Sequence, residues 1–140
     1  MPTRSPLIPL IPVLGLMVGC VAPPLNSTQT AELATEANIL KFAGPPIDSF
    51  TWLGTYDGFR TLGDKEVILF PTVNDGYLIR VRDPCINLRI ANKVGLTSSD
   101  RTVTRSFDHV LADNMQCRID TIRHIDYAAY KRARDAGTGS

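Results

Sequence analysis

The sequence has almost no excess of charge of either sign. Its 15 lysines and arginines are balanced by 14 aspartates and glutamates, and the formal net charge at pH 7 is +1. A nucleic-acid-binding protein usually presents a concentrated basic face. The one basic cluster here, residues 131–134, is short and is followed by Asp135. The composition therefore argues against nucleic acid as a partner and favours a solvated helix end for this cluster.

Motifs that carry known chemistry are also missing. The chain has no glycine-rich phosphate-binding motif and no G-x-S-x-G nucleophile motif. Its 2 histidines, His109 and His124, are not spaced like zinc ligands relative to the cysteines. Ser106 and Asp108 are close to His109 in sequence only, and triads assemble from separate segments. We therefore predict no cofactor, no metal site and no catalytic residue; a hydrolase using Asp108, His109 or His124 is the weakest hypothesis.

Cysteine is scarce, and the first of the 3 cysteines, Cys20, ends a hydrophobic leader. Residues 1–19 carry one basic residue, Arg4, then an apolar run over residues 7–18, and small Gly19 precedes the cysteine. This order is typical of a secretory signal. The run is about a dozen residues long, whereas a permanent transmembrane helix needs ~20. The sequence thus predicts an exported protein with a signal peptide at residues 1–19.

The residues Met17, Val18, Gly19 and Cys20 resemble the lipobox of bacterial lipoproteins, although leucine is usual where Met17 stands. The resemblance implies that Cys20 carries the lipid and that the membrane is a partner through it. Two or more acyl chains give a stable anchor, because each buried methylene contributes ~0.8 kcal/mol. Since Val21 is not aspartate, the resemblance also implies the outer membrane, facing the periplasm. Plain secretion with a conventional cut nearby is the alternative.

The other two cysteines, Cys85 and Cys117, are expected to pair, because an exported protein meets an oxidising compartment. The bridge would close a loop of roughly 33 residues and stabilise the fold by ~3.5–4 kcal/mol on the chain-entropy estimate. A redox-active pair is the rival interpretation, but it usually requires a close spacing such as C-x-x-C. The spacing favours a structural disulfide.

The region before the domain is predicted to be a tether followed by a helix. A helix is expected from Thr28 or Thr30 to about residue 42, with threonine as its N-cap and a narrow apolar stripe of Leu33, Ala37 and Leu40. The Gly-Pro-Pro at residues 44–46 should end it. We expect residues 20–48 to be the lipid-anchored tether and helix, 49–135 a single disulfide-bonded domain, and 136–140 a flexible tail.

Within the domain, β signals dominate. A hairpin of residues 66–71 and 76–82 is predicted, with its turn at residues 74–76 and with Val67 to Phe70 covered on both faces. Further strands are expected at residues 50–53, 86–90, 101–110 (with Val103 and Phe107 on one face) and 116–123, a loop at 92–101, and a helix at 127–135 capped by Asp126. The predicted fold class is α+β, mainly β: a small antiparallel sheet of five or six strands, an N-terminal helix, a short C-terminal helix and one disulfide.

The order of several short motifs resembles a known family. These motifs are Trp52, Val67 to Phe70, Tyr77 to Ile79, Cys85 to Leu88, Phe107 to Val110, and Cys117 to Ile122. Over roughly residues 49–126 the chain resembles a domain-of-unknown-function family of small exported bacterial proteins, many of them lipoproteins. The resemblance supports the paired cysteines and the exported location, and it implies no activity and no functional residue.

Together these features favour a non-catalytic cell-envelope lipoprotein that binds an envelope protein or ligand or has a structural role. The alternative is a periplasmic inhibitor or small-ligand-binding module, similar in size and disulfide use to periplasmic lysozyme inhibitors but without their tyrosine-glycine motifs. Trp52, Tyr56 and Phe59 could provide an aromatic ligand platform, although core packing is the ordinary role of such residues.

Overall fold

A computed structural model describes residues 2, 8–10, 19, 22–24 and 26–138. Most of the predicted signal peptide, Cys20 with its predicted lipid, and residues 139–140 lie outside the described residues. The described part contains two α-helices, one 3-10 helix and nine strands: α1 (Ser27–Leu40), β1 (Ala43–Ile47), β2 (Ser49–Thr51), β3 (Gly58–Thr61), β4 (Glu66–Phe70), β5 (Asp75–Val81), η1 (Leu88–Ile90), β6 (Val94–Leu96), β7 (Thr102–Thr104), β8 (His109–Ala112), β9 (Met115–Asp126) and α2 (Tyr127–Thr138).

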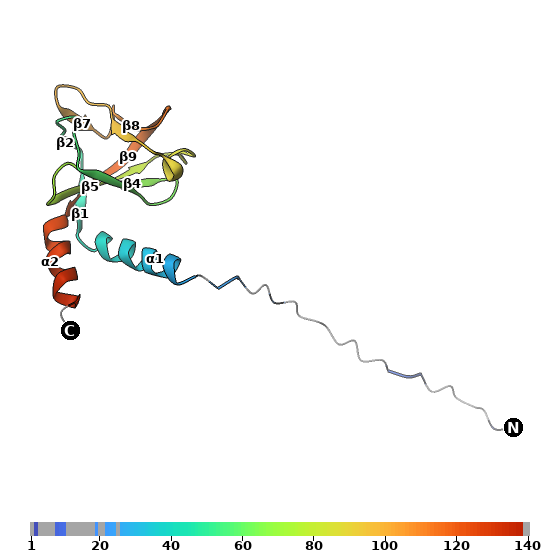
Figure 1. Ribbon diagram of the computed structural model, residues 1–140. Coiled ribbons are helices and arrows are strands. Elements are labelled where there is room, and N and C mark those ends of the chain that lie inside the picture. The colour runs from blue at the N-terminus through green and yellow to red at the C-terminus, as the bar shows by residue number, and fades with distance from the viewer. Residues whose placement is uncertain (1, 3–7, 11–18, 20–21, 25, 139–140) are drawn as a thin grey trace.

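The main sheet is antiparallel and has the strand order β3-β4-β5-β9-β8-β6, with β1 also paired to β9. Strands β2 and β7 form a separate antiparallel pair. The 12-residue strand β9 connects the two ends of this sheet, because its first residues pair with β8 and its later residues pair with β5 and β1. This confirms the predicted mainly β, antiparallel fold with a helix at each end and one disulfide, with more strands than the five or six expected (Figure 1).

The sheet is buried on both faces at its centre. In β4, Val67, Ile68 and Leu69 are all 0% exposed. Val67 and Leu69 belong to the larger core, whereas Ile68 points the other way into a smaller core. The smaller core is completed by the helices, which supply Ile39 from α1 and Tyr130 from α2. The expectation that this strand is covered on both faces is therefore confirmed.

A β-bulge between β5 and β9 keeps the larger core continuous. Arg80 pairs with Thr121, but the next residue, Val81, pairs with Ile119. The extra residue in β9 shifts the two-residue alternation by one. As a result Ile119 and Ile122, which would otherwise face opposite sides, both lie in the larger core.

The β4–β5 hairpin is confirmed, but its connection lies earlier than predicted. Asp75 and Gly76 already belong to β5, where they pair with Asp126 and Ile125 of β9. The space at position 76 is tight: a Cβ there would lie 3.2 Å from the ring of Phe70. The Asp-Gly sequence therefore lies in a closely packed strand and not in a turn.

Helix α1 begins differently from the prediction. Its N-cap is Asn26, not a threonine: Gln29 donates its backbone N–H to Asn26 Oδ1 at 2.8 Å, and Asn26 donates its backbone N–H to Gln29 Oε1. This reciprocal capping box satisfies two N–H groups at once. The predicted apolar stripe is also wrong in part, because Ala37 is exposed and the buried residue is Ile39, while the Leu33 side chain lies outside the described residues.

The helix ends before the Gly-Pro-Pro segment, as predicted, but that segment is itself a strand. Residues 43–47 form β1, which pairs with the last strand, β9, through Ala43↔Ile125 and Ile47↔Ile122. Proline is tolerated there because β1 is paired along one edge by β9. Residues 20–48 are therefore more than a tether and helix: the packed domain begins before residue 49.

Two other sequence predictions are wrong. Residues 86–90 are not a strand, because Leu88 donates its N–H to the Cys85 carbonyl and starts η1, which buries Leu88 and exposes Ile86 and Ile90. The predicted loop at residues 92–101 contains β6, which pairs with β8. The first prediction came from local alternation and the second from local polarity, and in both segments tertiary contacts decided the conformation instead.

The predicted strand at residues 101–110 is two strands. Phe107 and Asp108 donate their N–H groups to the Thr104 carbonyl and reverse the chain between β7 and β8. Val103 is consequently buried and Phe107 is 81% exposed, so they do not share a face. The long final strand was expected at residues 116–123 and runs from 115 to 126.

Helix α2 is capped as predicted, with Ala129 donating its N–H to Asp126 Oδ1 at 2.8 Å. It extends to Thr138, beyond the expected end at residue 135, so the first part of the predicted tail, residues 136–138, is helical. Figure 1 shows α1 and α2 lying together on the side of the sheet away from β2 and β7.

The burial of Ile39 yields a test of how α1 is held. Ile39→Ala should lower the free energy of unfolding by about 2–5 kcal/mol, because it removes a buried side chain from the smaller core. Urea unfolding followed by circular dichroism measures this. Leu53→Ala, at a side chain that is 71% exposed, is the matched control and should change stability by less than about 0.5 kcal/mol. Equal effects of the two substitutions would contradict the packing of α1 on the sheet.

Candidate functional site

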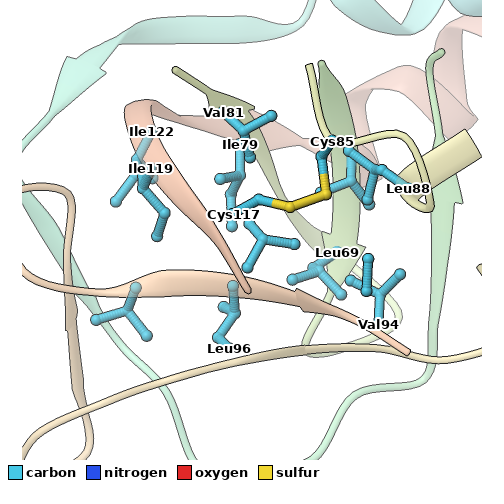
Figure 2. Packing of buried hydrophobic residues seen from close by; sticks show 14 of the residues in the cluster. Leu69, Ile79, Val81, Cys85, Leu88, Val94, Leu96, Cys117, Ile119 and Ile122 are labelled. Carbon is cyan, nitrogen blue, oxygen red and sulfur yellow. A yellow bond between two sulfur atoms is a disulfide. The ribbon is translucent and has the colours of Figure 1, made fainter. Parts of the chain in front are cut away.

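The predicted Cys85–Cys117 disulfide is present, with Cα atoms 5.9 Å apart. It ties the segment after β5 to β9 inside the larger core. Figure 2 shows the two sulfur atoms among aliphatic side chains, including Leu69, Ile79 and Leu88. Cys85 is 1% exposed and Cys117 is 7% exposed. Thiol–disulfide exchange requires access of an attacking thiolate to a sulfur atom, so this burial favours a structural bridge over a redox-active pair.

Removing the bridge should therefore affect stability. We expect Cys85→Ser to lower the free energy of unfolding by about 3.5–4 kcal/mol, since the loop between the cysteines is no longer closed in the unfolded chain. Urea unfolding of oxidised protein measures the loss. The double variant Cys85→Ser/Cys117→Ser is the control and should lose a similar amount. Unchanged unfolding of both variants would show that the bridge does not stabilise the domain.

Asp108 has a structural role. Its carboxylate, in a residue only 7% exposed, accepts hydrogen bonds from Thr97 Oγ1 at 2.8 Å and from the Thr104 backbone N–H at 2.7 Å. The Thr97 hydroxyl in turn accepts the backbone N–H of His109 at 2.9 Å. These bonds connect the ends of β6, β7 and β8. Both carboxylate oxygens of Asp108 are thus used within the fold.

His124 takes a different carboxylate as its partner. Its Nε2 lies 3.0 Å from Asp75 Oδ1, and its ring meets the edge of Tyr77 with centroids 5.3 Å apart. Burial, and next the negative charge of Asp75, raise the pKa of the Tyr77 phenol above its ordinary value of 10.0. Tyr77 is therefore neutral at physiological pH. The structure does not join Asp108 and His124 into one hydrogen-bonded constellation.

The described part of the chain contains no group of three or more histidine, cysteine, aspartate or glutamate side chains able to hold a metal ion.

The aromatic residues considered as a ligand platform belong to the core or pack against it. Trp52 is 4% exposed and stacks on Tyr56 with centroids 5.9 Å apart, and Tyr56 and Phe59 pack against the larger core.

The feature best suited to ligand binding is a cleft of about 590 Å³ between α1 and α2, beside β3. Pockets of 300–1,000 Å³ are typical of small-molecule sites. Its walls combine three cationic and three aromatic side chains: Lys41, Arg60, Arg134, Phe42, Tyr127 and Tyr130. We call this the helix cleft.

The aromatic wall of the helix cleft is held by ring contacts. Tyr127 stacks on Tyr130 with centroids 5.5 Å apart, and Tyr130 meets the edge of Phe42 at 5.8 Å. Phe70 of β4 packs against Tyr127 with ring centroids 4.6 Å apart. The rings are therefore positioned by the smaller core, and they provide apolar surface at the base of an open cleft.

The charged side chains that line the helix cleft are all positive. None of the described residues that line it is acidic. Lys41 donates from Nζ to the neutral Asn38 Oδ1 at 3.0 Å and has no ion pair with any described residue. The hydrogen bond and the charge of Asp135 raise the pKa of the Arg134 guanidinium above its usual range. Arg60 is exposed and has no ion pair with any described residue. An anionic group would meet attraction here.

A second hollow of about 470 Å³ continues the helix cleft along α1 and shares Thr35 and Arg60 with it. Its α1 lining begins at Thr28, whereas the α1 lining of the helix cleft ends at Asn38, just before Lys41 at the C-cap. The two hollows therefore follow α1 over most of its length.

The helix cleft was missed by sequence reasoning. The basic cluster at residues 131–134 was the available signal, but its members have separate roles. Lys131 donates to the Val73 carbonyl at 2.6 Å and lies over the Tyr127 ring at 5.4 Å, which fastens α2 to the β4–β5 connection. Arg132 is exposed, as expected for a solvated helix end, and Arg134 lines the cleft. Arg60 and Lys41 come from other elements.

These observations define a small, mainly β protein with a buried disulfide and a cationic, aromatic-walled cleft between its two helices. The chain belongs to a family of unknown function, DUF6491, whose profile matches residues 3–139. The expected resemblance to a family of unknown function is thus confirmed, over more of the chain than the motifs covered. No curated protein and no solved structure matches the chain significantly. In the described part of the chain, no helix is both long and apolar enough to span a membrane.

Proposed function

We propose that this protein is a non-catalytic cell-envelope lipoprotein whose domain binds an anionic ligand with an apolar part in the helix cleft. The observation that carries the proposal is the composition of that cleft, in which Lys41, Arg60 and Arg134 surround the rings of Phe42, Tyr127 and Tyr130. Arginine binds carboxylate and phosphate groups through paired N–H donors, and aromatic rings bind apolar groups with little loss of conformational entropy.

The location in the proposal is supported by the leader. The charged Arg4, the apolar run at residues 7–18 and the lipobox-like residues 17–20 are arranged as in bacterial lipoproteins. A buried disulfide suits a protein that folds in an oxidising compartment. Membrane attachment through Cys20 and a ligand site in the domain are separate parts of the proposal, and each has its own test.

Attachment is tested by Cys20→Ser. In a Gram-negative host the unchanged protein should stay in the membrane fraction after washing with carbonate, because acyl chains hold it there. Intact-mass spectrometry of the variant should show no acyl groups, and the variant should no longer be anchored in the membrane through them. Ser27→Ala, which leaves the lipobox-like residues unchanged, is the control. Absence of acyl mass from all three proteins would contradict the lipid anchor.

The ligand site is tested with anilinonaphthalene sulfonate, a fluorescent anionic aromatic probe. Binding to the Cys20→Ser chain should weaken by about 10-fold or more in Lys41→Glu/Arg60→Glu, because a charge-assisted contact contributes ~1.5–3 kcal/mol. Arg118→Glu/Arg132→Glu is the matched control: it changes the net charge equally at exposed positions outside the cleft.

All of these chains keep the leader, so any binding of the dye to it is common to them. Since the four side chains are exposed, each pair of substitutions should leave the thermal unfolding midpoint nearly unchanged. Equal dye affinity of the cleft variant and the control variant would overturn the helix cleft as an anion site.

A further inference from the structure

We propose that the ligand of the helix cleft is the phosphate headgroup of an anionic phospholipid in the membrane that carries the protein's own anchor. This inference rests on the proposed function and names its ligand. It joins three observations: the single sign of charge at the rim of the cleft, the aromatic rings at its base, and the short connection between Cys20 and α1.

The charge pattern fits a phosphate of a lipid. Lys41 at the end of α1 and Arg60 on β3 face the same hollow from different elements. A phosphodiester carries a single negative charge with acceptor oxygens on more than one side, so it can accept from both side chains at once. Lysine and arginine near an anionic membrane each contribute about 1 kcal/mol of attraction.

The aromatic base fits the part of a lipid next to its phosphate. Phe42, Tyr127 and Tyr130 line the hollow, and the Tyr130 ring contacts the other two. Tyrosine rings are amphipathic and concentrate at the level of membrane headgroups, where one side of the ring is apolar and the hydroxyl reaches water. The glycerol ester region beneath the phosphate would lie against these rings.

The connection to the anchor keeps the cleft near the membrane. Helix α1 begins at Ser27, seven residues after Cys20. Seven residues span at most about 25 Å. The α1 residues Thr35 and Asn38 line the helix cleft, so an α1 lying along the surface would hold the cleft at headgroup level. Tethering raises the effective concentration of the lipid at a site that can reach it.

The overall charge makes this attraction measurable. With a formal net charge of +1, the whole chain has little general attraction to an anionic surface. Binding that depends on anionic lipid would therefore come from a local group of cations. Lys41 and Arg60 can be changed without disturbing buried contacts, because both are exposed.

The experiment is flotation of the Cys20→Ser chain with vesicles. One set contains phosphatidylcholine alone, and in the other part of the phosphatidylcholine is replaced by phosphatidylglycerol. We expect tighter binding to the anionic vesicles, and a loss of at least about 25-fold in Lys41→Glu/Arg60→Glu, since each cation contributes about 5-fold and the introduced carboxylates are repelled by the lipid. Arg118→Glu/Arg132→Glu, with the same change of net charge, should lose less than about 5-fold.

Several results would contradict a phospholipid as the ligand of the helix cleft. Equal losses in the two variants, or equal binding to both kinds of vesicle, would overturn it. If anilinonaphthalene sulfonate still requires Lys41 and Arg60 while vesicles do not, the cleft binds an anion and only the lipid assignment fails. Displacement of the dye by inorganic phosphate without cleft-dependent vesicle binding would identify a soluble phosphate as the ligand. If Lys41→Glu/Arg60→Glu keeps both its dye binding and its vesicle binding, the proposed function is overturned as well.

Discussion

Strand β9 has neighbours along both of its edges and buried side chains on both of its faces. Its later residues pair with β5 on one side and β1 on the other, and its first residues pair with β8. Ile119 and Ile122 lie in the larger core, and Ile125 lies in the smaller one. Because both cores depend on this strand, the bulge that sets its register decides which side chains each core receives.

The two cores have different consequences for function. The larger core contains the disulfide and the tryptophan, and it is closed by strands and by η1. The smaller core is closed by two helices, which contribute Ile39 and Tyr130 and make few contacts with each other. Helices that share a narrow contact leave space beside it, and the helix cleft occupies that space. The rings that complete the smaller core, Tyr127 and Tyr130, are also the aromatic wall of the cleft.

Local patterns predicted the elements whose neighbours are close in sequence. The β4–β5 hairpin, the last strand and the Asp126 cap were found because alternation, chain reversal and capping are local properties. Strand β6 was missed and residues 86–90 were misassigned, since their conformations depend on pairing with β8 and on the turn at Cys85. The helix cleft could not be found in this way, because Lys41, Arg60 and Arg134 are far apart in the chain.

The sequence by itself determined the leader pattern, the near balance of charge, the pairing of Cys85 with Cys117 and the mainly β character. Each of these follows from composition or from signals within a few residues. Only the tertiary structure decided that β1 belongs to the sheet, that Asp108 is a buried structural carboxylate, and that cations from α1, β3 and α2 surround one hollow. The physical reason is that those arrangements depend on the register of β9 and on how two helices cover one sheet face, which are long-range contacts that no local pattern encodes.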